Sequence, residues 1–194
     1  MLGIAAAAAL AVTPLVATLV APVPVEARMQ TPDPCDFVTS GGFVVNPDSG
    51  KKANFGVHGG CKNGEFWGHL NFVDHANGYH VNSVEITAYL APEGVESPVR
   101  DVCGIAQSNN PLDPETFYFR ARLIDNGEPG GPELDQFALK LGVDSGYEVP
   151  LLALGTARPG GNVQLHSPNP STVVLPYVDE GAACGYLSFG GAPE

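Results

Sequence analysis

Short runs of alternating apolar and polar residues, each ended by a turn-forming residue, dominate this chain. Residues 53–58 read Ala-Asn-Phe-Gly-Val-His, and residues 69–73 read His-Leu-Asn-Phe-Val. Side chains along a β-strand point to opposite faces in turn, so each run predicts a strand with one buried face. The 24 Gly and 18 Pro residues among 194 argue against a long helical bundle.

Comparable segments recur along the chain with a spacing of about 10 to 20 residues, bounded by Gly, Pro, Asn or Asp. After Arg28 no segment keeps an apolar period of 3.6 residues over the roughly 11 residues of an average helix. The only helix that we expect therefore lies in the leader. The pattern predicts an all-β fold, an antiparallel β-sandwich of about 8–10 strands preceded by a cleavable signal helix. The expected strands cover residues 43–45, 53–58, 69–73, 81–90, 99–105, 117–124, 137–141, 163–165, 173–175 and 186–189.

The first 27 residues have the composition of a secretory signal peptide. Residues 2–25 contain no charged side chain, and residues 4–12 consist of Ala, Ile, Leu and Val. Val25 and Ala27 place small residues at the −3 and −1 positions, so cleavage should leave Arg28 as the N-terminus. The alternative is a retained membrane anchor, because about 20 apolar residues can span a bilayer. Three prolines inside the segment make the anchor less attractive.

The expected organisation is a signal peptide at residues 1–27, a linker at 28–34, one β-sandwich domain at 35–166 and a C-terminal extension at 167–194. The chain carries 21 acidic and 9 basic residues, a net charge of −12. This balance argues against nucleic acid or an anionic membrane as a partner. We therefore expect a monomer that is secreted or at the cell surface, with no membrane contact after the leader is removed.

The four cysteines predict two disulfides. They are Cys35, Cys61, Cys103 and Cys184, all after the leader and too far apart in sequence for a CxxC pair. An even number of cysteines in an exported protein favours disulfides over free thiols. Three connectivities remain open. A bond from Cys184 to any of the other three would fix the extension to the domain.

Several longer sequence words resemble a known family. They are CDFVTSGGF at 35–43, GKKANFGVHGG at 50–60, NGEFWGHLNFVDHANGYHVNSVEITAY at 63–89, FRARLIDNGEPGG at 119–131, LDQFALKL at 134–141 and GGNVQLH at 160–166. Together they resemble the post-COAP-1 domain of secreted bacterial proteins. The resemblance implies a compact, all-β, extracytoplasmic domain, found alone or at the end of larger surface proteins. It implies no established enzymatic activity, and so no catalytic residues. The family pattern ends near residue 166, before the extension that holds Cys184.

The five histidines, His58, His69, His75, His80 and His166, fall in or beside expected strands. Two imidazoles on one face could bind a metal ion. His69 and His75 would share a face, but six strand positions separate them by roughly 20 Å, too far for one ion. A shared site would need a third strand. We expect hydrogen-bonded or solvent-facing histidines and no metal site.

A hydrolase is the remaining catalytic hypothesis. Asp74 beside His75, with serines such as Ser83 and Ser188, offers the residue types of a Ser-His-Asp triad. The GxSxG, HExxH, GxGxxG and P-loop motifs are absent from the sequence. The many acidic residues could also form a carboxylate pair for glycoside hydrolysis, but their abundance does not single out two. We therefore predict no enzyme, no catalytic residue and no cofactor.

An acidic segment is a candidate calcium loop. Asp125, Asn126, Glu128, Glu133 and Asp135 bring five oxygen-bearing side chains into 11 positions, and Ca²⁺ takes 6 to 8 oxygen ligands. The competing interpretation is turn chemistry, because Asn-Gly is a strong hairpin signal and further Pro and Gly residues follow. The second interpretation is favoured here, with solvated carboxylates and a positive φ at Gly127.

Aromatic side chains could form a binding platform for a glycan or protein, although ordinary strand packing is the favoured interpretation. The candidates are Trp67, Tyr79, Tyr89, Tyr118, Tyr147, Tyr177 and Tyr186. The overall expectation is a non-catalytic secreted or surface module, binding or structural, whose partner is an unknown extracellular protein or glycan. A calcium- or glycan-binding module and a secreted hydrolase are the alternatives.

Overall fold

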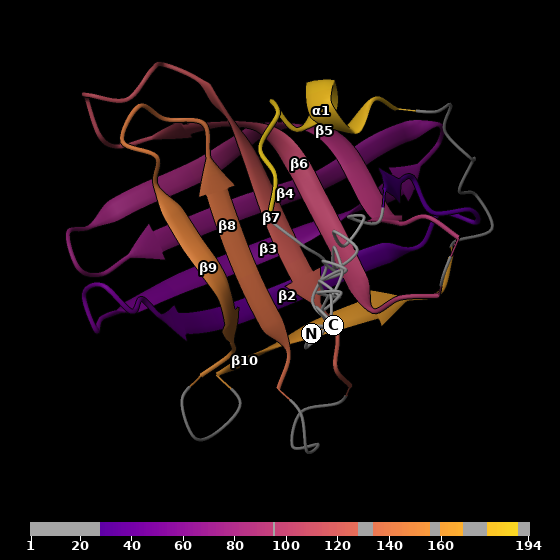
Figure 1. Cartoon of the computed structure of the whole chain (residues 1–194), viewed down its shortest axis with the longest axis horizontal. Coiled ribbons are helices and arrows are strands. Elements are labelled where there is room, and N and C mark those ends of the chain that lie inside the picture. Colours follow the sequence, from indigo (N-terminus) through magenta and orange to yellow (C-terminus); the bar gives the residue numbers. More distant parts are fainter. Residues whose placement is uncertain (1–27, 95, 128–133, 156–159, 169–177, 190–194) are drawn as a thin grey trace, which may run out of the picture.

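The computed structural model describes residues 28–94, 96–127, 134–155, 160–168 and 178–189. These residues form ten strands and one short helix (Figure 1). The all-β prediction is therefore confirmed for this part of the chain. The predicted signal helix and the predicted strand at 173–175 lie outside the described residues. The elements are β1 (Met29–Gln30), β2 (Phe37–Val45), β3 (Lys52–Lys62), β4 (Glu65–Asp74), β5 (Tyr79–Pro92), β6 (Val99–Ser108), β7 (Phe117–Ile124), β8 (Gln136–Leu141), β9 (Glu148–Ala153), β10 (Gly161–His166) and α1 (Glu180–Ala183).

All ten strands belong to one antiparallel sheet with the order β10-β2-β3-β4-β5-β6-β7-β8-β9, and β1 pairs with β5. The sheet curls, so that β2 to β5 lie behind β7 to β9 in Figure 1. The rings of Phe55 on β3 and Phe137 on β8 stack across the interior with centroids 3.9 Å apart. At the far end of the curl, the amide of Gly155 donates to the carbonyl of Phe43 on β2. The described strands thus form one curled antiparallel sheet, whereas the predicted sandwich consists of two sheets.

The interior of the curl is filled by the apolar residues of the alternating runs. Ala53, Phe55 and Val57 are buried, whereas Asn54 is exposed and His58 is half-buried. The runs at 117–124 and 137–141 pair with each other, as the Asn-Gly turn signal between them suggests, and Phe119 faces Leu141 in the register. Burial of one face per strand stabilises the fold at about 25 cal/mol per Å² of apolar surface. The other face of each strand points away from this interior.

Two features of the C-terminal part differ from the expectation. Residues 186–189 form no strand, and residues 180–183 form a helical turn that the sequence pattern did not predict. The Asp179 side chain caps this turn by accepting a hydrogen bond from the Ala182 amide. Gly185 and Tyr186 have φ values of 60° and 59°, in the left-handed region, which ends any extended run. The short strands β1 and β9 were also not predicted.

Two disulfides are present, Cys35–Cys61 and Cys103–Cys184. The first joins the start of β2 to the end of β3. The second joins α1 to β6, which confirms that Cys184 ties the extension to the sheet. There Cys184 lies in a second apolar cluster, on the outer surface of β5, β6 and β7. Within the described ranges, no helix is long and apolar enough to cross a membrane.

Candidate functional site

The outer surface of β10, β2, β3, β4 and the start of β5 carries the candidate site. The strand register aligns outward side chains in the middle of this surface in three rows that cross the strands. We call the residues of these rows the polar face. The rows are Asn162–Gly41–Gly56–Asn71–Asn82, Gln164–Thr39–His58–His69 and His166–Phe37–Gly60–Trp67.

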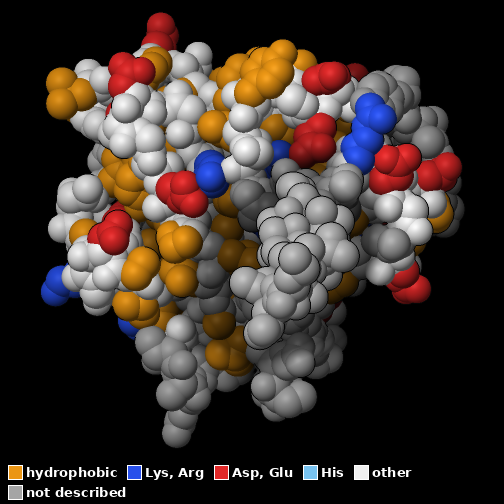
Figure 2. Space-filling view, viewed as in Figure 1, with side chains coloured by type: hydrophobic (Ala, Val, Ile, Leu, Met, Phe, Trp, Pro, Cys, Tyr) orange, Lys and Arg blue, Asp and Glu red, His pale blue; other side chains and the backbone are white. Residues whose placement is uncertain are grey.

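The three rows contain no Asp, Glu, Lys or Arg. Their side chains are amides, imidazoles, a hydroxyl and two aromatic rings. Charged side chains lie on the same outer surface beyond them, namely Lys52 and Lys62 of β3 and Glu65 of β4. The opposite side of the molecule, built from β6 to β9 and the C-terminal segment, has acidic and basic side chains scattered over it (Figure 2). The uncharged character therefore belongs to the three rows in the middle of this surface, and charged side chains flank them.

Aromatic rings form one end of the polar face. The rings of Phe37 and His166 stack with centroids 4.3 Å apart and an interplanar angle of 6°. Trp67 lies 5.9 Å from Phe37 and 5.6 Å from His58, measured between ring centroids. Gly60 sits between Phe37 and Trp67 in the register, and a Cβ at Gly60 would come within 2.5 Å of the Phe37 Cβ. The absence of a side chain at Gly60 is what lets these rings come together.

Glycine also lowers the middle of the polar face. Gly41 and Gly56 are direct partners across β2 and β3. A Cβ at Gly56 would meet nothing within 4 Å, so this position is open to solvent. On one side of it, the Asn71 amide donates to the Asn82 side-chain oxygen at 2.8 Å. The two glycines therefore present only backbone here, with the amide side chains of Asn71 and Asn82 beside them.

The imidazoles form the middle row. His58 and His69 are partners across β3 and β4, with ring centroids 6.1 Å apart. Burial, together with the charge of His69, lowers the pKa of His58, so that ring is neutral at neutral pH. The Nδ1 atom of His69 lies 3.0 Å from Ser83 Oγ, and Thr39 Oγ1 lies 2.8 Å from Nε2 of His166. A neutral imidazole offers one hydrogen-bond donor and one acceptor.

The residues of the predicted histidine pair do not come together, because His75 lies in the turn after β4. The strand partner of His69 is His58 instead, which supplies the additional strand that a shared site would need. No group of three or more His, Cys, Asp or Glu residues within the described ranges is arranged to hold a metal ion.

The candidate hydrolase residues are used in other ways. Asp74 is buried and accepts hydrogen bonds from the Tyr147 hydroxyl at 2.7 Å and the Asn46 amide at 3.1 Å. Ser83 contacts His69 and also accepts the Leu70 backbone N–H at 2.9 Å. Among the described residues, no carboxylate hydrogen-bonds to His69. A Ser-His pair without an orienting acid lacks the third member of a triad.

The structure corrects the expectation for the carboxylates of the acidic segment. Asp125 accepts the backbone N–H groups of Gly127 and Leu165, and Asp135 accepts those of Asn126 and Val163. These two carboxylates therefore hold β10 to the β7–β8 connection, and the expectation that they are merely solvated is wrong. Gly127 has the predicted positive φ, 107°. Glu128 and Glu133 lie outside the described residues.

The candidate aromatic residues divide into three groups. Tyr79 and Tyr89 are buried, and their hydroxyls donate to Asp113 and Asp36. Burial, and then the charge of Asp36, raises the pKa of Tyr89. Tyr118 and Tyr186 are exposed, away from the polar face. Of the seven candidates, Trp67 alone lies on the polar face among the described residues, whereas Tyr177 lies outside them.

The polar face has to be interpreted from its own geometry. No family model, curated protein or solved structure matches the chain. Sequence reasoning missed this face because it compared histidines along one strand and not between strands. The signal was present in the outward residues of two successive runs, Asn-Gly-His at 54, 56 and 58 and His-Asn-Val at 69, 71 and 73.

Proposed function

We propose that this protein is a non-catalytic, extracytoplasmic binding module whose polar face binds a neutral glycan. The proposal rests mainly on the three rows, whose side chains include no Asp, Glu, Lys or Arg. Amide groups and the neutral imidazole of His58 present donors and acceptors side by side, which suits the hydroxyl groups of a sugar. An aromatic ring such as that of Trp67 has an apolar body that can pack on a sugar ring. The three rows themselves offer no Lys or Arg side chain to a phosphate or carboxylate ligand.

Three further observations support the extracytoplasmic setting. The two disulfides favour an oxidising compartment. The apolar leader has the composition of an export signal. The sequence words shared with the post-COAP-1 domain agree with a secreted or surface protein. We accordingly propose membership of that family and a position outside the cytoplasm.

The non-catalytic assignment is supported by how the reactive groups are used. Ser83 has its hydroxyl in contact with His69 and Leu70, and Asp74 is occupied by Tyr147 and Asn46. A nucleophile needs a base that is itself oriented by a third group. Such a third group is missing around His69 in the described part of the chain.

The proposal is tested by affinity electrophoresis of the disulfide-bonded protein in gels that contain soluble neutral polysaccharides: a β-glucan, a xylan, a galactomannan or dextran. We expect retardation by at least one of them. Trp67→Ala and Asn71→Ala should each weaken the binding at least tenfold. Tyr186→Ala is the matched control, because this aromatic side chain is 82% exposed away from the polar face.

Two outcomes would contradict the proposal. One is retardation by anionic pectate but by none of the neutral polymers. The other is unchanged binding in both Trp67→Ala and Asn71→Ala, with thermal melts showing that both variants are folded.

A further inference from the structure

The strands β4 and β5 are paired along only part of their length. Their ladder runs from Asp74–Tyr79 to Asn71–Asn82 and stops there. Beyond that point β4 continues to Glu65 in its ladder with β3, and β5 continues in its ladder with β6. Within the described part of the chain, residues 65–69 of β4 and 83–86 of β5 therefore each have one edge without a partner strand. We call these two segments the strand fork.

Local irregularities hold the fork open. Gly68 has a φ of 153°, and a Cβ there would come within 2.2 Å of the His58 carbonyl oxygen. Opposite it, β5 has register shifts at Ser83/Glu85 and at Ile86/Ala88. The Ser83 hydroxyl accepts the N–H of Leu70 and so closes the end of the ladder. Bulges and strand glycines of this kind end pairing or allow another backbone to approach.

A hollow of about 660 Å³ lies between the two edges. One strand residue fills roughly 155 Å³, from spacings of about 4.8 Å between strands, 3.3 Å along a strand and 10 Å between layers. The hollow therefore matches about four residues of extended chain, as many as residues 66–69 of β4. Its lining residues are Glu65, Phe66, Trp67, Gly68, His69, Ser83, Val84, Glu85 and Ile86.

The lining indicates the chemistry of the occupant. Phe66 and Ile86 are half-buried and pack against the core, so they present an apolar base. Glu65 and Glu85 are exposed at the rim, and the lining contains no Lys or Arg. A strand alternates its side chains between two faces, so one face would meet the apolar base and the other the solvent side near the carboxylates.

We propose that the strand fork binds an extended peptide segment of a partner protein, with alternating apolar and basic residues, by strand addition. Backbone hydrogen bonds to the free edges supply affinity, and the alternate side chains supply specificity. The peptide would pack apolar residues toward Phe66 and Ile86 and pair Lys or Arg with Glu65 and Glu85. The hollow shares Trp67 and His69 with the polar face. The peptide would bind through the backbone edges, Phe66, Ile86 and the two carboxylates, so the variant that tests it, Glu85→Lys, differs from the variants that test glycan binding.

The probe is an acetylated, amidated octapeptide of four Lys-Val repeats, titrated into the disulfide-bonded protein and followed by amide hydrogen exchange. We expect protection of amides in residues 66–69 and 84–86. Glu85→Lys should weaken binding of this peptide at least tenfold. Glu93→Lys is the matched control, because Glu93 is an exposed carboxylate in the turn after β5, away from the hollow, and should leave binding unchanged.

Two comparison peptides separate strand addition from simple charge attraction. Four Glu-Val repeats should bind at least tenfold more weakly than the Lys-Val peptide. Four Lys-Pro repeats keep the charge but remove half of the backbone N–H donors, and they should also bind at least tenfold more weakly. Equal binding of the Lys-Val and Lys-Pro peptides, or no amide protection at either edge, would overturn the proposal.

Discussion

Replacing Asp101 with Asn should cost this protein a large share of its stability. Asp101 on β6 is fully buried and accepts hydrogen bonds from two arginines of β7. The Nε atom of Arg120 lies 2.7 Å from its Oδ2 atom, and the Nε atom of Arg122 lies 2.8 Å from its Oδ1 atom. The ring of Phe189 covers both guanidinium groups, at 5.8 and 4.9 Å. The substitution would leave the buried guanidinium group of Arg122 without a carboxylate partner.

Breaking a buried ion pair by removing one partner costs about 3–5 kcal/mol, since the remaining charge stays desolvated. The unfolding free energy of a whole domain is only about 5–15 kcal/mol. With a urea dependence of about 2 kcal/mol per M, the midpoint should fall by about 1.5–2.5 M. Urea unfolding with both disulfides intact, followed by far-UV circular dichroism, measures this shift.

The matched control is Glu148→Gln, which removes the pair that Glu148 makes with Lys140 at 3.2 Å. The side chain of Glu148 is 46% exposed, so the loss should stay below about 1 kcal/mol. A midpoint shift for Asp101→Asn no larger than that of the control would refute the reasoning. It would mean that water or a rearranged side chain solvates the two guanidinium groups once the carboxylate is gone.

Three other predictions follow from the same structure. The double variant Cys103→Ala with Cys184→Ala opens a loop of 81 residues and should lose about 4 kcal/mol, measured by urea unfolding against the parent. Asp135→Asn should lose about 1–3 kcal/mol, because one of two buried backbone N–H donors loses its acceptor, whereas Asp48→Asn, at an exposed turn, should stay within about 0.5 kcal/mol. The lowered pKa of His58 means that the unfolded chain binds a proton more readily, so thermal stability should fall as the pH drops below about 6.5. His58→Gln should reduce that fall in thermal melts between pH 7.5 and 5.5, and an unchanged pH slope would exclude His58 as its source.

The sequence predicted the strands well where burial is one-sided. The run at 53–58 became a strand with a core on one side, as its apolar period of two predicts. The run at 117–124 also became a strand, but the C-terminal segment covers its outer face and buries Arg120 and Arg122 as well. The prediction failed at 186–189, where the backbone N–H of Tyr186 donates to the Gly181 carbonyl at the end of the α1 turn and its φ is 59°. The choice of Cys103 as the partner of Cys184 also depends on how the chain packs over β6, which local sequence does not encode.

The candidate sites were less accessible to sequence reasoning, for a physical reason. The polar face exists only once the register brings His58 opposite His69 and Gly41 opposite Gly56. Register is set by the burial of whole strands and by turn geometry, not by the residues that share a row. The strand fork is even harder to predict from the sequence, because it is defined by the point at which β4 and β5 stop pairing.

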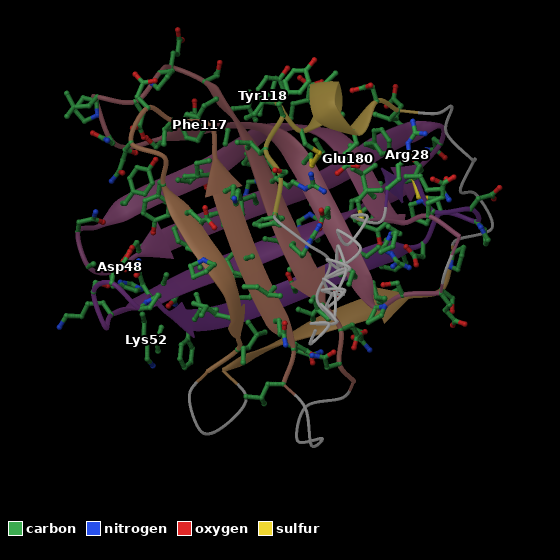
Figure 3. The ribbon with its side chains drawn as sticks, in the orientation of Figure 1. Arg28, Asp48, Lys52, Phe117, Tyr118 and Glu180 are labelled. Atoms are coloured by element: carbon green, nitrogen blue, oxygen red, sulfur yellow. A yellow bond between two sulfur atoms is a disulfide. The ribbon has the colours of Figure 1, made fainter. Side chains whose placement is uncertain are left out.

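The C-terminal segment determines how the protein would respond to a pulling force. The Glu180 carboxylate accepts the backbone N–H of Met29 and pairs with Arg120, and Cys184 is bonded to Cys103 (Figure 3). A load applied at residues 29 and 184 would therefore pass mainly through α1, β1, β5, β6 and β7, over a few close contacts. The strands β10, β2, β3 and most of β4 lie outside that path. The polar face would therefore keep its shape while these two residues are under tension.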